Sequence, residues 1–211
     1  MGDPVVAAIT AVLLAAGEST RMGQLKALLP WHGKTLLRYQ VDALLAAPVE
    51  RIVVVLGHRR EELLPILPSD PRVTTAVNDD YTSGKVSSIR TGIAAAPPGQ
   101  DILLLGVDQP RPPALITEVL GAHAAAGARI SVAACHGRGG HPVVFSAGLR
   151  PELLAITEES EGLRAVMRAH AGDVQHVETG DPLALVNLNT PEDYEAAVLL
   201  STTSNALAGN Q

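Results

Sequence analysis

The sequence predicts an α/β fold, with one doubly wound, mostly parallel sheet and helices on both of its faces. Short apolar runs rich in Val, Ile and Leu alternate with longer Ala/Leu-rich segments of helical spacing. The runs are apolar throughout, which is typical of strands that helices cover on both sides. The chain has 211 residues, a length that suits one domain.

The first half of the chain alternates strand and helix. Residues 8–14 form a short apolar run before a glycine, which predicts a buried strand. Residues 35–46 carry apolar side chains at helical spacing, and residues 51–56 contain Ile-Val-Val-Val, typical of a strand. Residues 61–67 predict a helical turn that prolines interrupt. A third strand is expected at 72–77.

The second half continues the alternation. Residues 86–96 place apolar side chains on one helical face, and residues 101–107 read as a fully buried strand. Residues 112–126 predict a helix that begins with prolines, where they are tolerated. The remaining expected elements are strands at 129–134, 143–145 and 174–177, and helices at 151–156, 162–170 and 191–200.

Four loops are expected to build the functional site, because ligands of open α/β sheets bind beyond the carboxyl ends of the strands. They are residues 15–30, 78–88, 108–113 and 137–142. We expect residues 1–200 to form the domain. Residues 201–211 are small and polar, which predicts a flexible tail.

Composition disfavours several classes of protein. The net charge of −6 argues against a nucleic-acid binder. No apolar run approaches the ~20 residues that span a bilayer, so no membrane association is expected. The apolar run near the start follows no Lys or Arg, which disfavours a signal peptide. The single cysteine, Cys135, excludes an internal disulfide and suits a cytoplasmic location; we interpret it as a small buried hydrophobe.

The segment after the first strand contains the parts of a polyphosphate site. Gly17 and Gly23 favour sharp turns with exposed N–H groups, Ser19 adds a donor, and Arg21 and Lys26 bring two positive charges. It matches neither the dinucleotide fingerprint nor the phosphate-binding P-loop pattern. A glycine turn with surface charges is the competing interpretation.

Asp108 follows the buried strand at 101–107. In the crevice of an α/β sheet, this carboxylate has the chemistry of a Mg²⁺ ligand, since Mg²⁺ takes one or two carboxylates together with substrate phosphates and water. It is equally suited to cap the helix that follows. The sequence alone leaves both roles open.

Five ordered motifs together carry a family resemblance. They are Leu-Ala-Ala-Gly-Glu-Ser-Thr-Arg-Met-Gly-Gln-Leu-Lys with Leu-Leu-Pro at 14–30, Asn-Asp-Asp-Tyr-Thr-Ser-Gly-Lys-Val-Ser-Ser-Ile-Arg-Thr-Gly at 78–92, Asp-Gln-Pro at 108–110, Gly-His-Pro-Val at 140–143 and Asn-Leu-Asn-Thr-Pro-Glu-Asp at 187–193. This pattern resembles the MobA-like nucleotidyltransferases, most closely their molybdenum cofactor cytidylyltransferase branch. The resemblance implies a Rossmann-like fold of the nucleotide-diphospho-sugar transferase type.

The resemblance also implies the chemistry: transfer of CMP from CTP to the phosphate of a molybdopterin-type cofactor, with Mg²⁺ as cofactor and release of pyrophosphate. The implied catalytic residues are Arg21, Lys26 and Asp108, with Asp108 also the metal ligand. The implied nucleotide-binding residues are Leu14, Ala15, Ala16, Gly17, Glu18, Ser19, Lys26, Asn78, Gly84, Ser88 and Asp108. Asn189 stands where many relatives carry Asp, and we interpret it as a contact to phosphate or to metal-bound water.

Some positions separate this chain from its relatives or leave two interpretations. Ala16 is typical of the cytidine-specific branch, since its methyl narrows the base pocket. Leu25 replaces the usual Pro or Asp, which would loosen the phosphate loop. Lys85 replaces an apolar residue and either adds charge near a pterin phosphate or points to solvent. His141 either binds the acceptor or makes a structural hydrogen bond.

Three functions remain to be distinguished. The first is the cytidylyltransferase, and the second is a related guanylyltransferase or sugar-phosphate nucleotidyltransferase. The third is a non-catalytic module that delivers the finished cofactor to a molybdenum hydroxylase. Retention of Arg21, Lys26 and Asp108 favours catalysis, because delivery requires no metal-bound triphosphate. A monomer or weak oligomer is expected.

Overall fold

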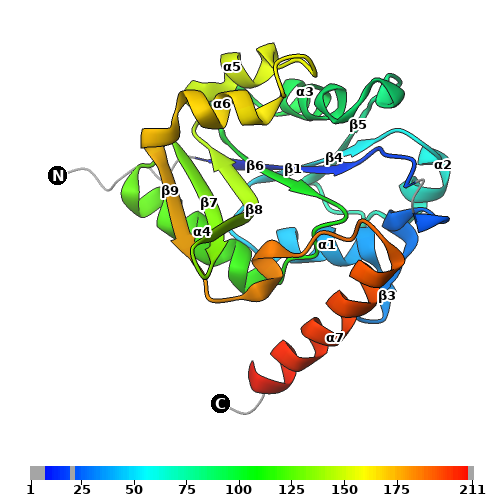
Figure 1. Ribbon diagram of the computed structural model, residues 1–211. Coiled ribbons are helices and arrows are strands. Elements are labelled where there is room, and N and C mark those ends of the chain that lie inside the picture. Colours follow the sequence, from blue (N-terminus) through cyan, green and yellow to red (C-terminus); the bar gives the residue numbers. More distant parts are fainter. Residues whose placement is uncertain (1–7, 20–21, 209–211) are drawn as a thin grey trace.

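The computed structural model describes residues 8–19 and 22–208 and has a central sheet of seven strands (Figure 1). The order across the sheet is β5-β4-β1-β6-β8-β7-β9. The strands are β1 (Ile9–Ala15), β4 (Arg51–Leu56), β5 (Val73–Val77), β6 (Asp101–Gly106), β7 (Ile130–Cys135), β8 (Arg138–Phe145) and β9 (Val174–Glu178). All adjacent pairs are parallel except those of β8, so the predicted α/β class and mostly parallel sheet are confirmed.

Strand β8 corrects one prediction. It pairs antiparallel with both β6 and β7 and begins at Arg138, so most of the predicted loop 137–142 is strand. His136 and Gly137, with φ of 51° and 74°, form the turn that returns the chain from β7. Positive φ at both positions suits a tight hairpin. Glycines and a proline hid this strand, because both residue types are depleted in strand interiors.

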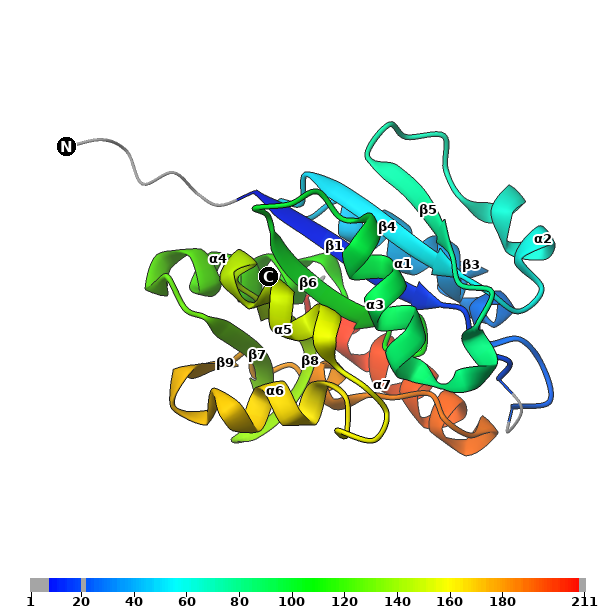
Figure 2. The same cartoon turned by 90° about the horizontal axis from the view of Figure 1, so that it is seen from above.

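Helices cover both faces of the sheet (Figures 1 and 2). One face carries α1 (Leu36–Leu45) and α4 (Pro113–Ala126), and the other carries α3 (Lys85–Ala95), α5 (Arg150–Ala155) and α6 (Leu163–Ala169). Two separate apolar clusters fill the spaces between the sheet and these layers. Alternate residues of each strand supply the two clusters, as strand geometry requires.

The remaining elements frame the edges of the domain. They are the hairpin of β2 (Pro30–Trp31) and β3 (Lys34–Thr35), the helix α2 (Arg60–Leu63), the 3₁₀ turns η2 (Lys26–Leu28), η3 (Leu64–Ile66), η4 (Tyr81–Ser83), η5 (Ala147–Leu149), η6 (Ala171–Asp173) and η7 (Pro182–Leu185), and the helix α7 (Pro191–Ala208). Helix α7 continues past its predicted end at Leu200, into the segment expected as a tail. Within the described residues, no helix is both long and apolar enough to cross a membrane.

The register of the strands brings together the loops that were expected to build the functional site. Leu14 lies opposite Gly106 in the parallel pair β1–β6, so the loops after these strands leave the sheet together. Gly92 lets α3 lie close to the sheet, since a Cβ there would come 2.3 Å from Val12 and 2.7 Å from Val55. This close approach packs the later part of α3 against β1 and β4.

Candidate active site

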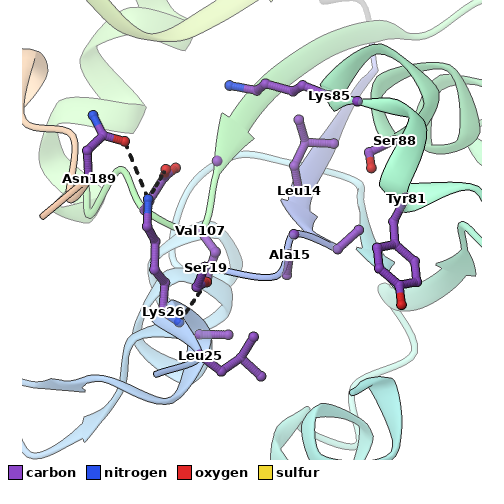
Figure 3. A pocket seen from close by; sticks show the side chains of 16 residues that line it. Leu14, Ala15, Ser19, Leu25, Lys26, Tyr81, Lys85, Ser88, Val107 and Asn189 are labelled. Carbon is purple, nitrogen blue, oxygen red and sulfur yellow. Dashed lines mark hydrogen bonds and ion pairs between the residues drawn. The ribbon is translucent and has the colours of Figure 1, made fainter. Parts of the chain in front are cut away.

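A pocket of about 450 Å³ opens where β1 and β6 end and α3 begins (Figure 3). Its position beyond the carboxyl ends of parallel strands is the one expected for this class of sheet. Its lining is formed by Leu14, Ala15, Ala16, Gly17, Ser19, Leu25, Lys26, Ala27, Tyr81, Gly84, Lys85, Ser88, Gly106, Val107, Asp108 and Asn189.

The floor of the pocket contains an ion pair between residues far apart in the sequence. The Lys26 Nζ donates to Asp108 Oδ2 at 3.0 Å and to Asn189 Oδ1 at 3.4 Å. The Lys26 and Asp108 side chains are only 14% and 27% exposed, so solvent screens this pair less than a surface pair. Two of the predicted catalytic residues are thus brought together with Asn189.

The structure excludes one of the two roles considered for Asp108. Helix α4 begins after Pro112, with no side chain capping it, so the helix-cap interpretation is wrong. Asp108 Oδ1 instead lies over Gly106, where a Cβ would come within 2.5 Å of it. Its main-chain oxygen accepts from the Leu188 amide at 2.8 Å. The carboxylate therefore lines the pocket, where it pairs with Lys26 and caps no helix.

Asn189 is held by the start of α7. Its amide and that of Thr190 both donate to Asp193 Oδ2 at 3.0 Å, and the Asp193 amide donates back to the Thr190 hydroxyl. This reciprocal arrangement is a capping box. The closing motif of the sequence thus acts locally, by ordering the helix terminus that presents Asn189 to Lys26.

Buried amides order the segment around Asp108. Gln40, fully buried in α1, donates through Nε2 to the carbonyls of Gly106 and Gln109. The Gln109 side chain accepts from the Gly106 amide at 2.8 Å and donates to Asn187 Oδ1 at 2.7 Å. Since buried polar groups require partners, these bonds fix the backbone on both sides of the carboxylate.

Arg111 is the largest fully buried side chain. Its guanidinium donates to four main-chain oxygens, those of Pro110, His141, Ala184 and Val186, at 2.8–3.0 Å. Burial lowers its pKa to about 9, while the charges of Asp108 and Asp181 act in the opposite direction. Arg111 therefore ties β8 and the segment before Asn189 to the loop that carries Asp108.

The loop after β1 turns at Ser19, which has a φ of 59°. Its carbonyl accepts from the Met22 amide at 2.9 Å and its hydroxyl from the Lys26 amide at 3.0 Å. Gly17 lines the pocket, and a Cβ on it would meet no atom within 4 Å. The backbone there is open to a ligand.

Other residues predicted in this loop differ in position. Glu18 is exposed and is not among the pocket-lining residues. Leu25 lines the pocket and is also part of the buried core, so its apolar side chain packs the loop against the core. Leu14, Ala15 and Ala16 line the pocket as part of β1 and the residue after it. Arg21 lies outside the described residues.

The start of α3 forms the opposite wall. Gly84, Lys85 and Ser88 line the pocket, whereas Asn78 does not. Asn78 is buried and donates through Nδ2 to the Ser87 and Ser88 hydroxyls at 2.8 and 2.9 Å. Any contribution of Asn78 to ligand binding is therefore made through Ser88, and direct contact with a base is not supported by this geometry.

Ala16 and Tyr81 form one end of the pocket around a glycine. A Cβ on Gly57 would come 2.8 Å from the Ala16 carbonyl and 2.9 Å from Tyr81 Cβ. Any larger residue at position 57 would displace Ala16 or Tyr81, so only glycine fits there. Tyr81 also packs its ring against His58, with the centroids 5.8 Å apart. Ala16 and Tyr81 thus bring a methyl group and an aromatic ring to this end of the pocket.

His141 lies on β8 and is not among the pocket-lining residues. Its carbonyl accepts from Arg111, while its buried Nδ1 has no partner. Burial is the main cause that lowers the pKa of the His141 ring to about 3, and the positive charges of Arg111 and Lys85 act in the same direction. The imidazole ring is therefore neutral at physiological pH. The structural hydrogen bond of His141 is the one that its backbone carbonyl accepts from Arg111.

The oxygen donors of the pocket fit a hard cation. Asp108 Oδ2 and Asn189 Oδ1 both point at the Lys26 ammonium, which stands between them. Among the described residues, no group of three His, Cys, Asp or Glu side chains lies close enough to hold a metal. This set suits Mg²⁺, which keeps water and takes substrate phosphates beside one or two protein oxygens.

A family model described as the MobA-like NTP transferase domain matches residues 11–175. The chain belongs to this family. In this MobA-like nucleotidyltransferase, the signature loop and Asp108 follow the two neighbouring strands β1 and β6, whose ends meet at the pocket. The fold and the enzyme class predicted from the motifs are confirmed.

Relatives of this MobA-like protein carry different names. It is 33% identical to the nicotine blue oxidoreductase of Paenarthrobacter nicotinovorans, covering 91% of this chain and 97% of that protein. It is 28% identical to the molybdenum cofactor cytidylyltransferase of Escherichia coli K12, with 91% and 96% covered. The crystal structure of Rv0371c from Mycobacterium tuberculosis superposes with a TM-score of 0.79 at 25% identity, covering 92% and 99%.

Sequence reasoning missed four residues that shape this site. Gln40 carried a signal, since it is a lone amide on the apolar face of a predicted helix. Tyr81 stood inside a quoted motif without an assigned role. Gly57 and Arg111 carried no signal, because the contacts that define them come from distant segments.

Proposed function

We propose that the protein transfers CMP from CTP to the phosphate of a molybdopterin-type cofactor and releases pyrophosphate. The observation that carries the proposal is the Lys26–Asp108 pair at 3.0 Å, in the same pocket as the open Gly17 backbone and in a chain of this family. A cationic side chain, a carboxylate and exposed backbone N–H groups are the parts that phosphoryl-type transfer requires.

Each residue has a defined task in this proposal. Bound Mg²⁺, held by Asp108 with Asn189 nearby, would neutralise phosphate charge as a Lewis acid. The backbone at Gly17 and Ser19 cradles the triphosphate. When the nucleotide phosphates enter the pocket, the Lys26 ammonium leaves Asp108 and pairs with them. Arg21, outside the described residues, is proposed to neutralise the leaving pyrophosphate.

Two observations support CTP as the nucleotide. The Ala16 methyl and Tyr81 narrow the end of the pocket that suits a base, which favours the smaller pyrimidine. The Escherichia coli relative is named a molybdenum cofactor cytidylyltransferase.

Mg²⁺ as the metal is supported by the oxygen donors of Asp108 and Asn189. The mycobacterial relative Rv0371c has also been solved in complex with manganese. We also propose that the protein is located in the cytoplasm as a monomer or weak oligomer. The recipient of the finished cofactor is proposed to be a molybdenum hydroxylase.

The test is to incubate the protein with Mg²⁺, purified molybdenum cofactor and each nucleoside triphosphate in turn, and to measure pyrophosphate. We expect release with CTP that depends on the cofactor. Preference for GTP would replace the cytidylyl proposal with a guanylyl one. Because the most identical of the relatives described above is named an oxidoreductase, reduction of nicotine blue by NADH or NADPH is measured in parallel. Reduction without pyrophosphate release would overturn transfer.

Ala16→Gly should shift preference toward the purine nucleotide. Removing the methyl enlarges the base end of the pocket, and one methyl is worth roughly 10–200-fold in the ratio of specificity constants. The measurement is the CTP-to-GTP ratio of kcat/KM at fixed Mg²⁺. Ser83→Gly, in the exposed turn before α3, serves as the control for a change outside the pocket lining. An unchanged ratio in Ala16→Gly shows that another residue selects the base.

A further inference from the structure

Lys85 reaches across the pocket from the first position of α3. It lines the pocket, and its side chain extends along the pocket edge in the direction of Asn189 (Figure 3). It stands where the resemblance leads one to expect an apolar residue. The pocket therefore has a second lysine, on the wall opposite Lys26.

The charge of Lys85 has no counter-ion in the part of the chain that the structure describes. Lys26 is paired with Asp108, whereas no hydrogen bond or ion pair between described residues involves the Lys85 side chain. Glu158, the carboxylate at this helix terminus, is engaged elsewhere: its Oε1 accepts from the Val86 amide at 2.8 Å. An exposed cation on a pocket wall is thus left for a ligand.

The position of Lys85 separates it from the base end of the pocket. Its side chain extends away from Tyr81 and in the direction of Asn189 (Figure 3). Its positive charge also adds to burial and to Arg111 in lowering the pKa of His141. His141 lies on β8, the neighbour of β6, whereas Ala16 and Tyr81 lie on the β4 side of the pocket. A ligand that reaches Lys85 and the β8 side is therefore distinct from the nucleobase.

We propose that Lys85 binds the phosphate of the acceptor, and so selects acceptors that carry a phosphate monoester. The inference rests on the proposed function, in which this phosphate attacks the α-phosphorus of the nucleotide. A lysine on a flexible stem suits this task, because it offers a compact charge that follows the phosphate as it approaches. Lys26 and Lys85 then hold the two reacting phosphates from opposite walls.

The test compares Lys85→Met, Lys85→Arg and the control Lys34→Met. Met keeps the length of the stem and removes the charge; Lys34 is a half-exposed lysine of β3 that pairs with Asp42. We expect Lys85→Met to raise KM for the molybdenum cofactor about 10–100-fold, the value of a charged hydrogen bond. KM for CTP should be unchanged. Lys85→Arg should restore most of the affinity, and Lys34→Met should behave as wild type.

The outcomes separate this inference from the proposed function. Transfer by the wild type with an unchanged acceptor KM in Lys85→Met overturns the inference alone, as does an increase confined to KM for CTP. If the wild type transfers nothing, inorganic phosphate is titrated calorimetrically into protein saturated with CMP. Weaker phosphate binding in Lys85→Met than in Lys34→Met supports the phosphate subsite; equal binding, or none to the wild type, overturns it.

Discussion

Asp108→Asn should reduce CMP transfer by a factor on the order of 10²–10³, the loss typical of removing a charged group that acts on the transition state. The substitution keeps the shape of the side chain and removes its negative charge. It therefore weakens the hold on Mg²⁺ and leaves the backbone bonds of the loop in place. The measurement is the transfer rate as a function of Mg²⁺ concentration, and we expect both a lower rate and a higher half-saturating concentration.

Lys26→Met is the matched variant, because it removes the other half of the same ion pair. It should lower the rate to a comparable degree without raising the half-saturating Mg²⁺ concentration, since the carboxylate remains. An Asp108→Asn enzyme that keeps more than about a tenth of the wild-type rate, a change of only about 1.4 kcal/mol in the barrier, contradicts the assignment of Asp108 as the metal ligand.

Arg111→Met should lower the free energy of unfolding by about 3–5 kcal/mol. Four buried main-chain oxygens lose their donor, and the gain from no longer burying a charge offsets this only in part. For a domain of this size, the melting temperature should fall by about 6–20 °C. Thermal and denaturant unfolding measure the effect.

Arg38→Met controls for the loss of an arginine as such. Arg38 is 42% exposed and pairs with Asp42 on the surface of α1, so its removal should cost less than about 1 kcal/mol. If Arg111→Met unfolds at the same temperature as Arg38→Met, Arg111 does not hold the loops together and the reasoning from its four bonds is wrong.

The sequence by itself determined the elements whose patterns are local. Strand β4 was predicted at 51–56 and found at Arg51–Leu56, because a run of β-branched residues buried on both faces has few alternatives. Most helices differ from their predicted bounds by one or two residues. The family was predicted from five ordered motifs, whose residues can be recognised in the sequence without knowing the contacts they make.

Only the tertiary structure decided how those residues meet. The pairing of β1 with β6 places the two following loops side by side, and no local pattern encodes the 3.0 Å between Lys26 and Asp108. The same holds for residues 138–142, which lie in a strand because β7 supplies pairing partners such as Ala134 for Gly139 and Cys135 for Arg138. Arg111 is charged and was assigned no role, yet it is fully buried, because four carbonyls from three segments converge on it. Burial and partners are properties of the assembled chain, so they can be known only once distant segments are in place.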